Sequence, residues 1–373
     1  MLGAKPFASY EIAMNNQSLI KWTPMGNGVV PRGLAFLYGC AVFLRNRLYD
    51  LVPSLSYNIG KPVISIGGIH AGGTGKTPLC RLVARHFVDA GASVAFLSRG
   101  YGRPTKNLVI CKPDETTAWY LVGDEPAMLH DALPQTWLGV CANRRKTARL
   151  LCNIVPQNTV FVLDDGFQHR QISRSMNIVC LPPDTFSDLL LPAGSLREPL
   201  VNCERAQCIC IVGSREQMDL CTRSRERLAE LFPGKPIFTL QQVPVSWRNL
   251  ATGQTVERPP VMKALMLSGI ARPERFGNIL SDMGISVAAS YVFDDHHVFT
   301  QKEIQDLRGE RFDGIITTEK DATRLRTIKL VNDLDIWYLT IGLSFFGPTT
   351  ADQFYENLNV SISSYNLKGR YSA

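Results

Sequence analysis

The sequence has no apolar run close to the roughly 20 residues that a helix needs to cross a bilayer. It has 10 cysteines but no CxxC pair and no His or Cys spacing typical of a zinc site. We therefore expect a protein that is not integral to a membrane, with small, buried, reduced cysteines of a cytosolic protein. Cys208 and Cys210 would face the same side of a strand, and a metal site there is the alternative.

A basic stripe with interleaved aromatic residues is also missing, which argues against nucleic-acid binding. The net charge is +7, from 40 Lys and Arg against 33 Asp and Glu, and it suits an acidic partner such as a nucleotide or a phospholipid. The length of 373 residues and the hydrophobic fraction of 45% predict a globular protein of one large or two ordinary domains, and we expect two.

From Lys61 onward, short β-rich apolar runs alternate with turns and with longer stretches of helical periodicity. This alternation predicts an α/β fold with a mostly parallel sheet and helices on both faces. The clearest strands are expected at residues 62–66, 93–97, 159–163, 177–181, 207–212, 263–267, 287–293, 314–318 and 335–339.

The alternation breaks between residues 240 and 263, where Pro, Gly and polar residues mix as in a linker or a hairpin. We predict a P-loop domain at 61–240, a linker at 241–262 and a smaller C-terminal α/β domain at 263–373. Residues 1–60 would form an N-terminal extension whose first 25 residues look polar and loosely ordered.

Residues 34–44, LAFLYGCAVFL, form an apolar run flanked by Arg32, Arg45 and Arg47. As an amphipathic helix with cationic ends, this segment would suit a monotopic membrane anchor. A helix packed on the protein core is the alternative, and composition does not decide between the two.

A glycine-rich loop, GGTGKT, lies between the strand PVISI and the helical stretch LCRLVARHFVDA. In this context the backbone N–H groups of the loop wrap phosphate oxygens, the lysine reaches the β and γ phosphates, and the threonine hydroxyl ligates Mg²⁺. The predicted nucleotide-binding residues are Gly72, Gly73, Thr74, Gly75, Lys76 and Thr77. His70 replaces the first glycine of the common motif, and Ala71 replaces the extra lysine of partition-type ATPases.

Two acidic pairs are candidates for metal binding or proton transfer. Asp164 and Asp165 end the apolar run TVFVL, where a Mg²⁺ ligand beside a phosphate loop is required, although an ordinary turn is the alternative. Asp124 and Glu125 begin a predicted helix, either as stabilising caps or as a general base and a carboxylate that supports the metal.

Basic residues at turns include Arg99, Arg103, Arg144, Arg145 and Arg197. A single surface arginine is usually only solvated, whereas several near a phosphate site would clamp an anionic substrate. In the C-terminal half, the string FDDHH contains His296 and His297 after a predicted strand, with either a structural or a catalytic role.

Eight strings occur together in the order found in the tetraacyldisaccharide 4′-kinases of lipid A synthesis, and they cover roughly residues 61–325. They are PVISIGGIHAGGTGKTP, LSRGYGR, VGDEP, LDDGFQHR, LPAGSLREP, LSGIARPERF, FDDHH and TTEKDA. The sequence therefore resembles that family closely. The resemblance implies transfer of the γ-phosphate of ATP, with Mg²⁺, to the 4′-hydroxyl of a tetraacyldisaccharide 1-phosphate.

The resemblance also implies roles for single residues. Lys76 and Thr77 would hold ATP and Mg²⁺, while Asp124, supported by His296, would activate the sugar hydroxyl. The remaining implied contacts are Glu125, Asp164 and Asp165 for the metal, and Arg99, Arg197 and Glu198 for the substrate.

Family members carry a basic, apolar N-terminal helix that docks on the inner membrane. For this chain the resemblance thus favours a peripheral enzyme at the cytoplasmic face, with an anionic glycolipid substrate and no obligate protein partner. One rival hypothesis is a partitioning or switch ATPase that acts on a protein partner, and Ala71 argues against it. Another is a kinase for a soluble small molecule, and residues 34–44 argue against that.

Overall fold

The computed structural model describes residues 28–261, 263–307 and 312–370. The predicted loose segment at residues 1–25 lies outside this part of the chain. The chain forms two compact units: a larger one of the described residues up to Val243 together with Gly342 onward, and a smaller one of Pro244–Ile341. Each unit is described by itself.

The larger unit is built on a sheet with the order β8-β7-β6-β1-β5-β2-β4-β3. Neighbouring strands are parallel, except for the antiparallel pair of β3 and β4. The strands are β1 (Val63–Gly67), β2 (Ser93–Ser98), β3 (Val109–Cys111), β4 (Trp137–Val140), β5 (Thr159–Asp164), β6 (Met176–Leu181), β7 (Cys208–Gly213) and β8 (Ile237–Asn249). The strands predicted in this region are confirmed, whereas β3, β4 and β8 were not predicted.

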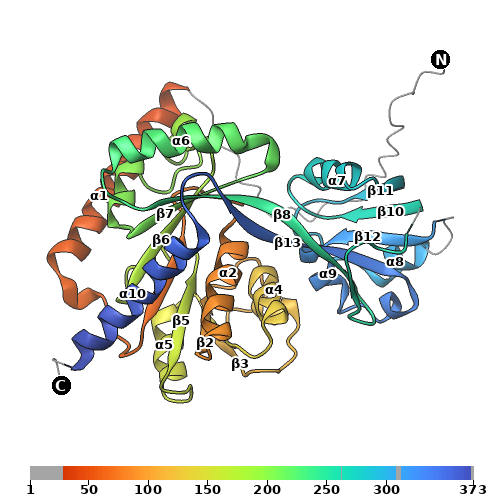
Figure 1. Cartoon of the computed structure of the whole chain (residues 1–373), viewed down its shortest axis with the longest axis horizontal. Coiled ribbons are helices and arrows are strands. Elements are labelled where there is room, and N and C mark those ends of the chain that lie inside the picture. The colour runs from red at the N-terminus through yellow and green to blue at the C-terminus, as the bar shows by residue number, and fades with distance from the viewer. Residues whose placement is uncertain (1–27, 262, 308–311, 371–373) are drawn as a thin grey trace. The chain divides into compact units, whose positions relative to one another are not determined.

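Helices cover both faces of this sheet, as predicted (Figure 1). Successive residues of β1 and β5 alternate between the two hydrophobic cores, so these strands are buried on both faces. One face carries α2 (Lys76–Asp89), α4 (Asp124–Ala132) and α10 (Ala351–Arg370), and the other carries α5 (Arg144–Cys152) and α6 (Met218–Leu231).

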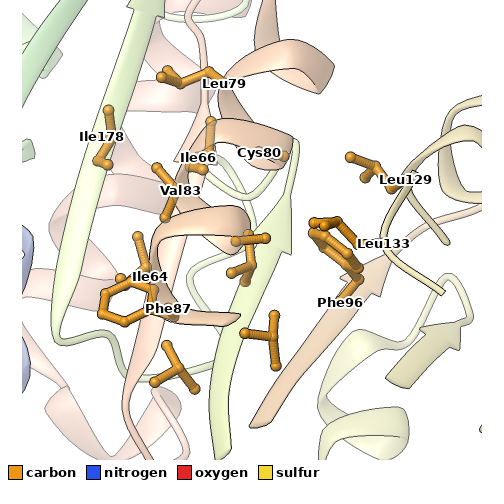
Figure 2. Packing of buried hydrophobic residues seen from close by; sticks show 14 of the residues in the cluster. Ile64, Ile66, Leu79, Cys80, Val83, Phe87, Phe96, Leu129, Leu133 and Ile178 are labelled. Carbon is orange, nitrogen blue, oxygen red and sulfur yellow. The ribbon is translucent and has the colours of Figure 1, made fainter. Parts of the chain in front are cut away.

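The core below the phosphate loop is packed from α2 and the central strands. Figure 2 shows Leu79 and Val83 of α2 beside Ile64 and Ile66 of β1, with Phe96 of β2 nearby. All five side chains are fully buried. This packing holds the first turn of α2 at the carboxyl end of β1, where the loop connects them.

Short helices complete the connections of the larger unit: α3 (Trp119–Val122) and the 3₁₀ turns η1 (Pro53–Leu55), η2 (Thr185–Ser187), η3 (Leu200–Arg205) and η4 (Arg215–Gln217). Cys208 and Cys210 of β7 point into the same core and are fully buried, as the strand period predicted. Among the described residues, no group of three or more His, Cys, Asp or Glu side chains could hold a metal ion.

The smaller unit contains the parallel strand order β11-β10-β12-β13. Its strands are β9 (Thr255–Val256), β10 (Lys263–Ser268), β11 (Ser286–Val292), β12 (Gly314–Thr318) and β13 (Ile336–Phe346). Helix α7 (Pro273–Asp282) packs in one core, and α8 (Gln301–Asp306) and α9 (Glu319–Leu325) pack in the other; a 3₁₀ turn η6 (Lys329–Asp333) precedes β13.

The division of the chain differs from the predicted domain ranges at its C-terminal end. Residues from Gly342 onward group with the larger unit, because α10 packs on α2. His86 of α2 stacks on Tyr355 of α10, with ring centroids 4.6 Å apart, and hydrogen-bonds Asn359 at 2.8 Å. The segment 241–262 is hairpin-like, since β9 pairs antiparallel with the end of β8.

Helix α1 (Val29–Leu51) covers the predicted apolar segment. One face, with Ala35, Val42 and Asn46 buried, packs on the larger unit, whereas Phe36 and Leu51 on the rest of the surface are 71% and 77% exposed. The helix therefore packs on the protein, as one alternative predicted, and also exposes apolar side chains to solvent, as a membrane anchor would. Within the described residues, no helix has the length and apolarity to span a bilayer.

Candidate active site

The glycine-rich loop connects β1 to α2 at the carboxyl edge of the sheet. Gly72 and Gly75 have φ angles of 108° and 82°, which side chains rarely adopt, and a Cβ on Gly75 would lie 2.6 Å from Val212. Lys76 begins α2, and its Nζ donates to the carbonyl of Gly72 at 3.0 Å. Thr77 follows in the same first turn. The residues predicted to bind nucleotide thus form a compact loop at a helix N-terminus.

The loop is fastened to the segment that contains Arg197. The backbone N–H of Ala71 donates to Ser195 at 2.8 Å, and that of Arg197 donates to Ile69 at 2.6 Å. His70, at the position of the usual first glycine, is buried, and its backbone forms an isolated antiparallel β-bridge with Leu196. These contacts explain why Arg197 lies beside the phosphate loop.

Asp164 ends β5, next to β1, and its side chain is almost completely buried. One carboxylate oxygen accepts a hydrogen bond from Ser98 at 3.0 Å. Burial, together with the charges of Asp165 and Glu125, raises the pKa of Asp164 to about 6. A nearby cation such as Mg²⁺ would favour the ionised form of this carboxylate.

Asp165 has the opposite electrostatic environment. Both of its carboxylate oxygens accept hydrogen bonds from Arg197 at 2.8 Å, and Lys76 Nζ lies 3.8 Å from one of them. Burial opposes ionisation, but the hydrogen bonds from Arg197 and the charge of Lys76 prevail and hold the pKa of Asp165 well below its usual range. The second guanidinium nitrogen of Arg197 also donates to the carbonyl of Gly68 at 2.9 Å.

The acidic pair of α4 lies in the helix's first turn. Asp124 is buried, and the influence of Glu125 on the pKa of Asp164 indicates that this turn is close to the end of β5. Gly123, which precedes the pair, has a φ of 99° and lies against the backbone of Gly100 and Tyr101. The fold thus brings the strings VGDEP, LSRGYGR and LDDGFQHR to one edge of the sheet.

The two remaining predicted substrate contacts differ in their surroundings. Arg99 is exposed at the end of β2, and its charge lowers the pKa of Arg144 as a minor cause after burial. Glu198 is fully buried, and its carboxylate accepts hydrogen bonds from Asn46 of α1 at 2.9 Å and Asn202 at 2.8 Å. It also pairs with Arg205 at 2.9 Å, so Glu198 links α1 to the loop that contains Arg197.

The two candidate histidines are adjacent in the smaller unit but contact different side chains. His297 stacks on Phe293 with ring centroids 4.4 Å apart, and its Nε2 lies 3.1 Å from Glu303. His296 has a φ of 63°, and its Nε2 lies 3.2 Å from Lys320 Nζ, which also contacts Asp295 at 3.0 Å. His297 is thus part of an aromatic cluster, whereas His296 is part of a polar one. The predicted pairing of His296 with Asp124 stays a prediction.

Two residues that help to form the site were not predicted. Ser98 donates to Asp164, and its position at the end of the predicted strand beside the central ones is a signal that could have found it. Arg174 is half-buried and donates to the carbonyls of Gly166 at 2.7 Å and His169 at 2.5 Å, which supports the turn after Asp165. No local pattern distinguishes Arg174 from a surface arginine.

The residues present fit ATP with Mg²⁺. The loop amides, Lys76 and Arg197 supply positive groups for phosphates, and the positive φ of Gly72 and Gly75 lets the backbone curl. Mg²⁺ in kinases is held by one or two protein oxygens together with phosphates, so the hydroxyl of Thr77 and the carboxylates of Asp164 and Asp165 are a sufficient donor set.

An apolar parallel strand, a glycine-rich loop ending in Lys-Thr and a helix that begins at this lysine define a P-loop nucleotide-binding protein of the α/β class. Comparisons with known proteins then narrow the class. Residues 30–359 match the family model described as tetraacyldisaccharide-1-P 4′-kinase. The chain belongs to this family.

Individual relatives agree over most of their length. A tetraacyldisaccharide 4′-kinase of Chlorobaculum parvum is 34% identical, over 85% of this chain and 91% of the relative, and one of Phocaeicola vulgatus is 33% identical, over 90% and 94%. The crystal structure of LpxK from Aquifex aeolicus in complex with ATP is 28% identical, has a TM-score of 0.72 and covers 90% of this chain and 98% of its own.

Proposed function

We propose that the phosphate loop, the two aspartates after β5 and the first turn of α4 form the site of phosphoryl transfer in this family member. The chain is an ATP- and Mg²⁺-dependent kinase of lipid A biosynthesis that phosphorylates the 4′-hydroxyl of tetraacyldisaccharide 1-phosphate. The observation that carries the proposal is the ion network of Lys76, Asp165 and Arg197 at the start of α2, with Glu125 of α4 close enough to influence the neighbouring Asp164.

The roles of the residues follow from their charges and positions. When bound, ATP would supply the phosphoryl group and Mg²⁺ would neutralise the charge that develops on the phosphate oxygens. Lys76 and the loop amides bind and orient the phosphates, and Arg197 adds a positive charge that Asp165 holds in place. Asp124 accepts the proton of the acceptor hydroxyl. The supporting role of His296, which the family resemblance implies, stays a proposal. Asp164 and Thr77 would provide oxygen ligands for the metal.

The test is transfer from ATP to the disaccharide lipid in neutral detergent micelles, with a soluble sugar as the comparison acceptor. Lys76→Ala is expected to abolish turnover, and Asp124→Asn to lower kcat by about 10²- to 10⁴-fold, the range for removal of a general base. Matched controls are Lys112→Ala, an exposed lysine at the end of β3, and Asp131→Asn, later on α4. Near-normal turnover in both site variants would refute the site.

We also propose that α1 holds the enzyme on the cytoplasmic face of the inner membrane. Its packed face is fixed to the protein through Tyr38, which donates to the carbonyl of Arg197 at 2.9 Å, and through the bond from Asn46 to Glu198. The apolar side chains on its other surfaces include Phe36, Leu37, Phe43, Leu44, Leu48 and Leu51, all exposed. Such a helix lies in the interface with its apolar surface among the lipid chains.

Vesicle sedimentation tests this proposal. The variant Phe36→Ser with Leu44→Ser is expected to bind neutral vesicles more weakly and to keep its thermal stability, because both side chains are exposed. The matched control, Leu231→Ser with Val360→Ser, removes two exposed apolar side chains from α6 and α10 and should bind as the wild type does. Equal binding by both variants would exclude α1 as the anchor.

A further inference from the structure

A basic hollow lies between α5 and the segment that follows α1, and none of its lining residues is among those assigned to phosphoryl transfer. Its volume is about 880 Å³, and its lining includes Tyr49 at the end of α1, Tyr57, and the three cations Arg145, Lys146 and Arg149 of α5. Among the described residues that line it, none is Asp or Glu. The hollow therefore has the charge to receive an anion.

Two of these cations are held close together by one aromatic ring. The guanidinium carbons of Arg145 and Arg149 lie 4.9 Å and 5.3 Å from the ring centroid of Tyr57. The two residues are one helical turn apart on α5, a spacing at which like charges destabilise a helix. Stacking on Tyr57 offsets part of this repulsion, and an anion between the guanidinium groups would offset more of it.

Exposed apolar side chains lie along one border of the hollow, next to polar lining residues such as Asn153 and Gln171, and they indicate the source of the anion. Leu150 lines the hollow and is 43% exposed, Ile154 follows the lining residue Asn153 and is 50% exposed, and Leu51 ends α1. A soluble anion needs no such border, whereas a phospholipid brings a phosphate and acyl chains together. Cationic side chains next to an interfacial helix are attracted to anionic lipids.

We propose that Arg145, Lys146 and Arg149 bind the phosphate headgroup of an anionic bilayer phospholipid, which thereby orients the enzyme on the membrane. The proposal rests on the proposed docking of α1, because the hollow begins where that helix ends. Binding involves no chemical step: the guanidinium and ammonium groups donate hydrogen bonds to phosphate oxygens, and the exposed leucines and isoleucine contact the chains.

The test uses the full chain and vesicles of phosphatidylcholine, with or without phosphatidylglycerol and without the kinase acceptor. The wild type should bind the anionic vesicles more tightly. Arg145→Gln with Arg149→Gln should lose about 25-fold in affinity for anionic vesicles and keep its affinity for neutral ones, since each cation near the surface contributes about fivefold. Lys146 is exposed, and Lys146→Gln should lose about fivefold in affinity for anionic vesicles.

The matched control is Arg223→Gln with Arg227→Gln on α6. This pair has the same spacing and charge, and Arg227 also stacks on an aromatic ring, that of Phe186, at 3.8 Å. It should change anionic binding by less than about threefold. An equal loss of affinity in this control would mean that only the net charge of the protein matters, and it would overturn the proposal. Wild-type affinity of the α5 variants for anionic vesicles would also overturn it. Turnover of the wild type in neutral micelles tests the kinase site separately.

Discussion

Two turns with paired aspartates, one in each unit, begin from the same sequence pattern and end in different environments. Asp164 and Asp165 follow the parallel strand β5, and Asp294 and Asp295 follow the parallel strand β11. Each turn holds a non-glycine residue in the left-handed region, Asp165 with a φ of 44° and His296 with 63°. Such residues cost on the order of 1 kcal/mol each and persist where their surroundings hold them.

The surroundings are what differ. At the first turn, cations from two separate segments, Lys76 and Arg197, contact Asp165, and the backbone carbonyls of the turn accept hydrogen bonds from Arg144 at 2.9 Å and 3.0 Å. At the second turn, Lys320 contacts Asp295 and His296. Both acidic pairs therefore meet a cation from another segment, but at the first turn two cations converge, and one of them, Lys76, begins α2 at the end of the glycine-rich loop.

The largest expected effect on kcat comes from removing the ion network of the first turn. Asp165→Asn should lower kcat by about a thousandfold, because Arg197 and Lys76 lose the carboxylate that positions them for phosphates. Asp295→Asn, the equivalent change in the second turn, should have a smaller effect. The measurement is transfer to the lipid acceptor at saturating ATP, and equal losses in the two variants would remove the distinction between the turns.

The next largest effect distinguishes the roles of His296 and His297 at the second turn. His296→Ala should lower kcat by about a hundredfold and leave the melting temperature nearly unchanged, because its ring contacts the half-buried polar groups of Lys320 and Asp295. His297→Ala should instead lower the melting temperature, because it removes a ring stacked on Phe293 and a partner of Glu303. The reverse pattern would assign the catalytic role to His297.

The smallest effect concerns stability within the first turn. The pKa of Asp164 is about 6 in the folded protein, above its usual value, so the folded state binds the proton more tightly and loses stability as the pH rises from about 4 to 6. Without Mg²⁺, Asp164→Asn should therefore raise the free energy of unfolding at pH 7 by about 2 to 3 kcal/mol and flatten its pH dependence in this window.

Asp165→Asn provides the opposite control. Its lowered pKa means that the ionised carboxylate stabilises the fold above about pH 4 and that this contribution is lost as the pH falls further. The variant should thus be less stable than the wild type at pH 7, as measured by denaturant unfolding. A stabilised Asp165→Asn or a destabilised Asp164→Asn would contradict the assigned environments.

Much of this protein could be predicted from the sequence alone, because the relevant signals are local. Strands buried on both faces need continuous apolar, β-branched runs, and all the strands read from such runs are present. The phosphate loop needs glycines and Lys-Thr at fixed spacing between a strand and a helix, and GGTGKT has this context. The order of the eight strings identified the family, which the family model and the relatives confirm.

Only the tertiary structure decided what each polar residue contacts. Neighbouring aspartates with the same side chain have pKa values shifted in opposite directions, because one faces the core and the other faces Arg197. Glu198 follows Arg197 in sequence yet is buried against α1, and α10 packs on α2, far from it in sequence. Burial and long-range contacts set these outcomes, and no local pattern records which distant segment will supply the partner.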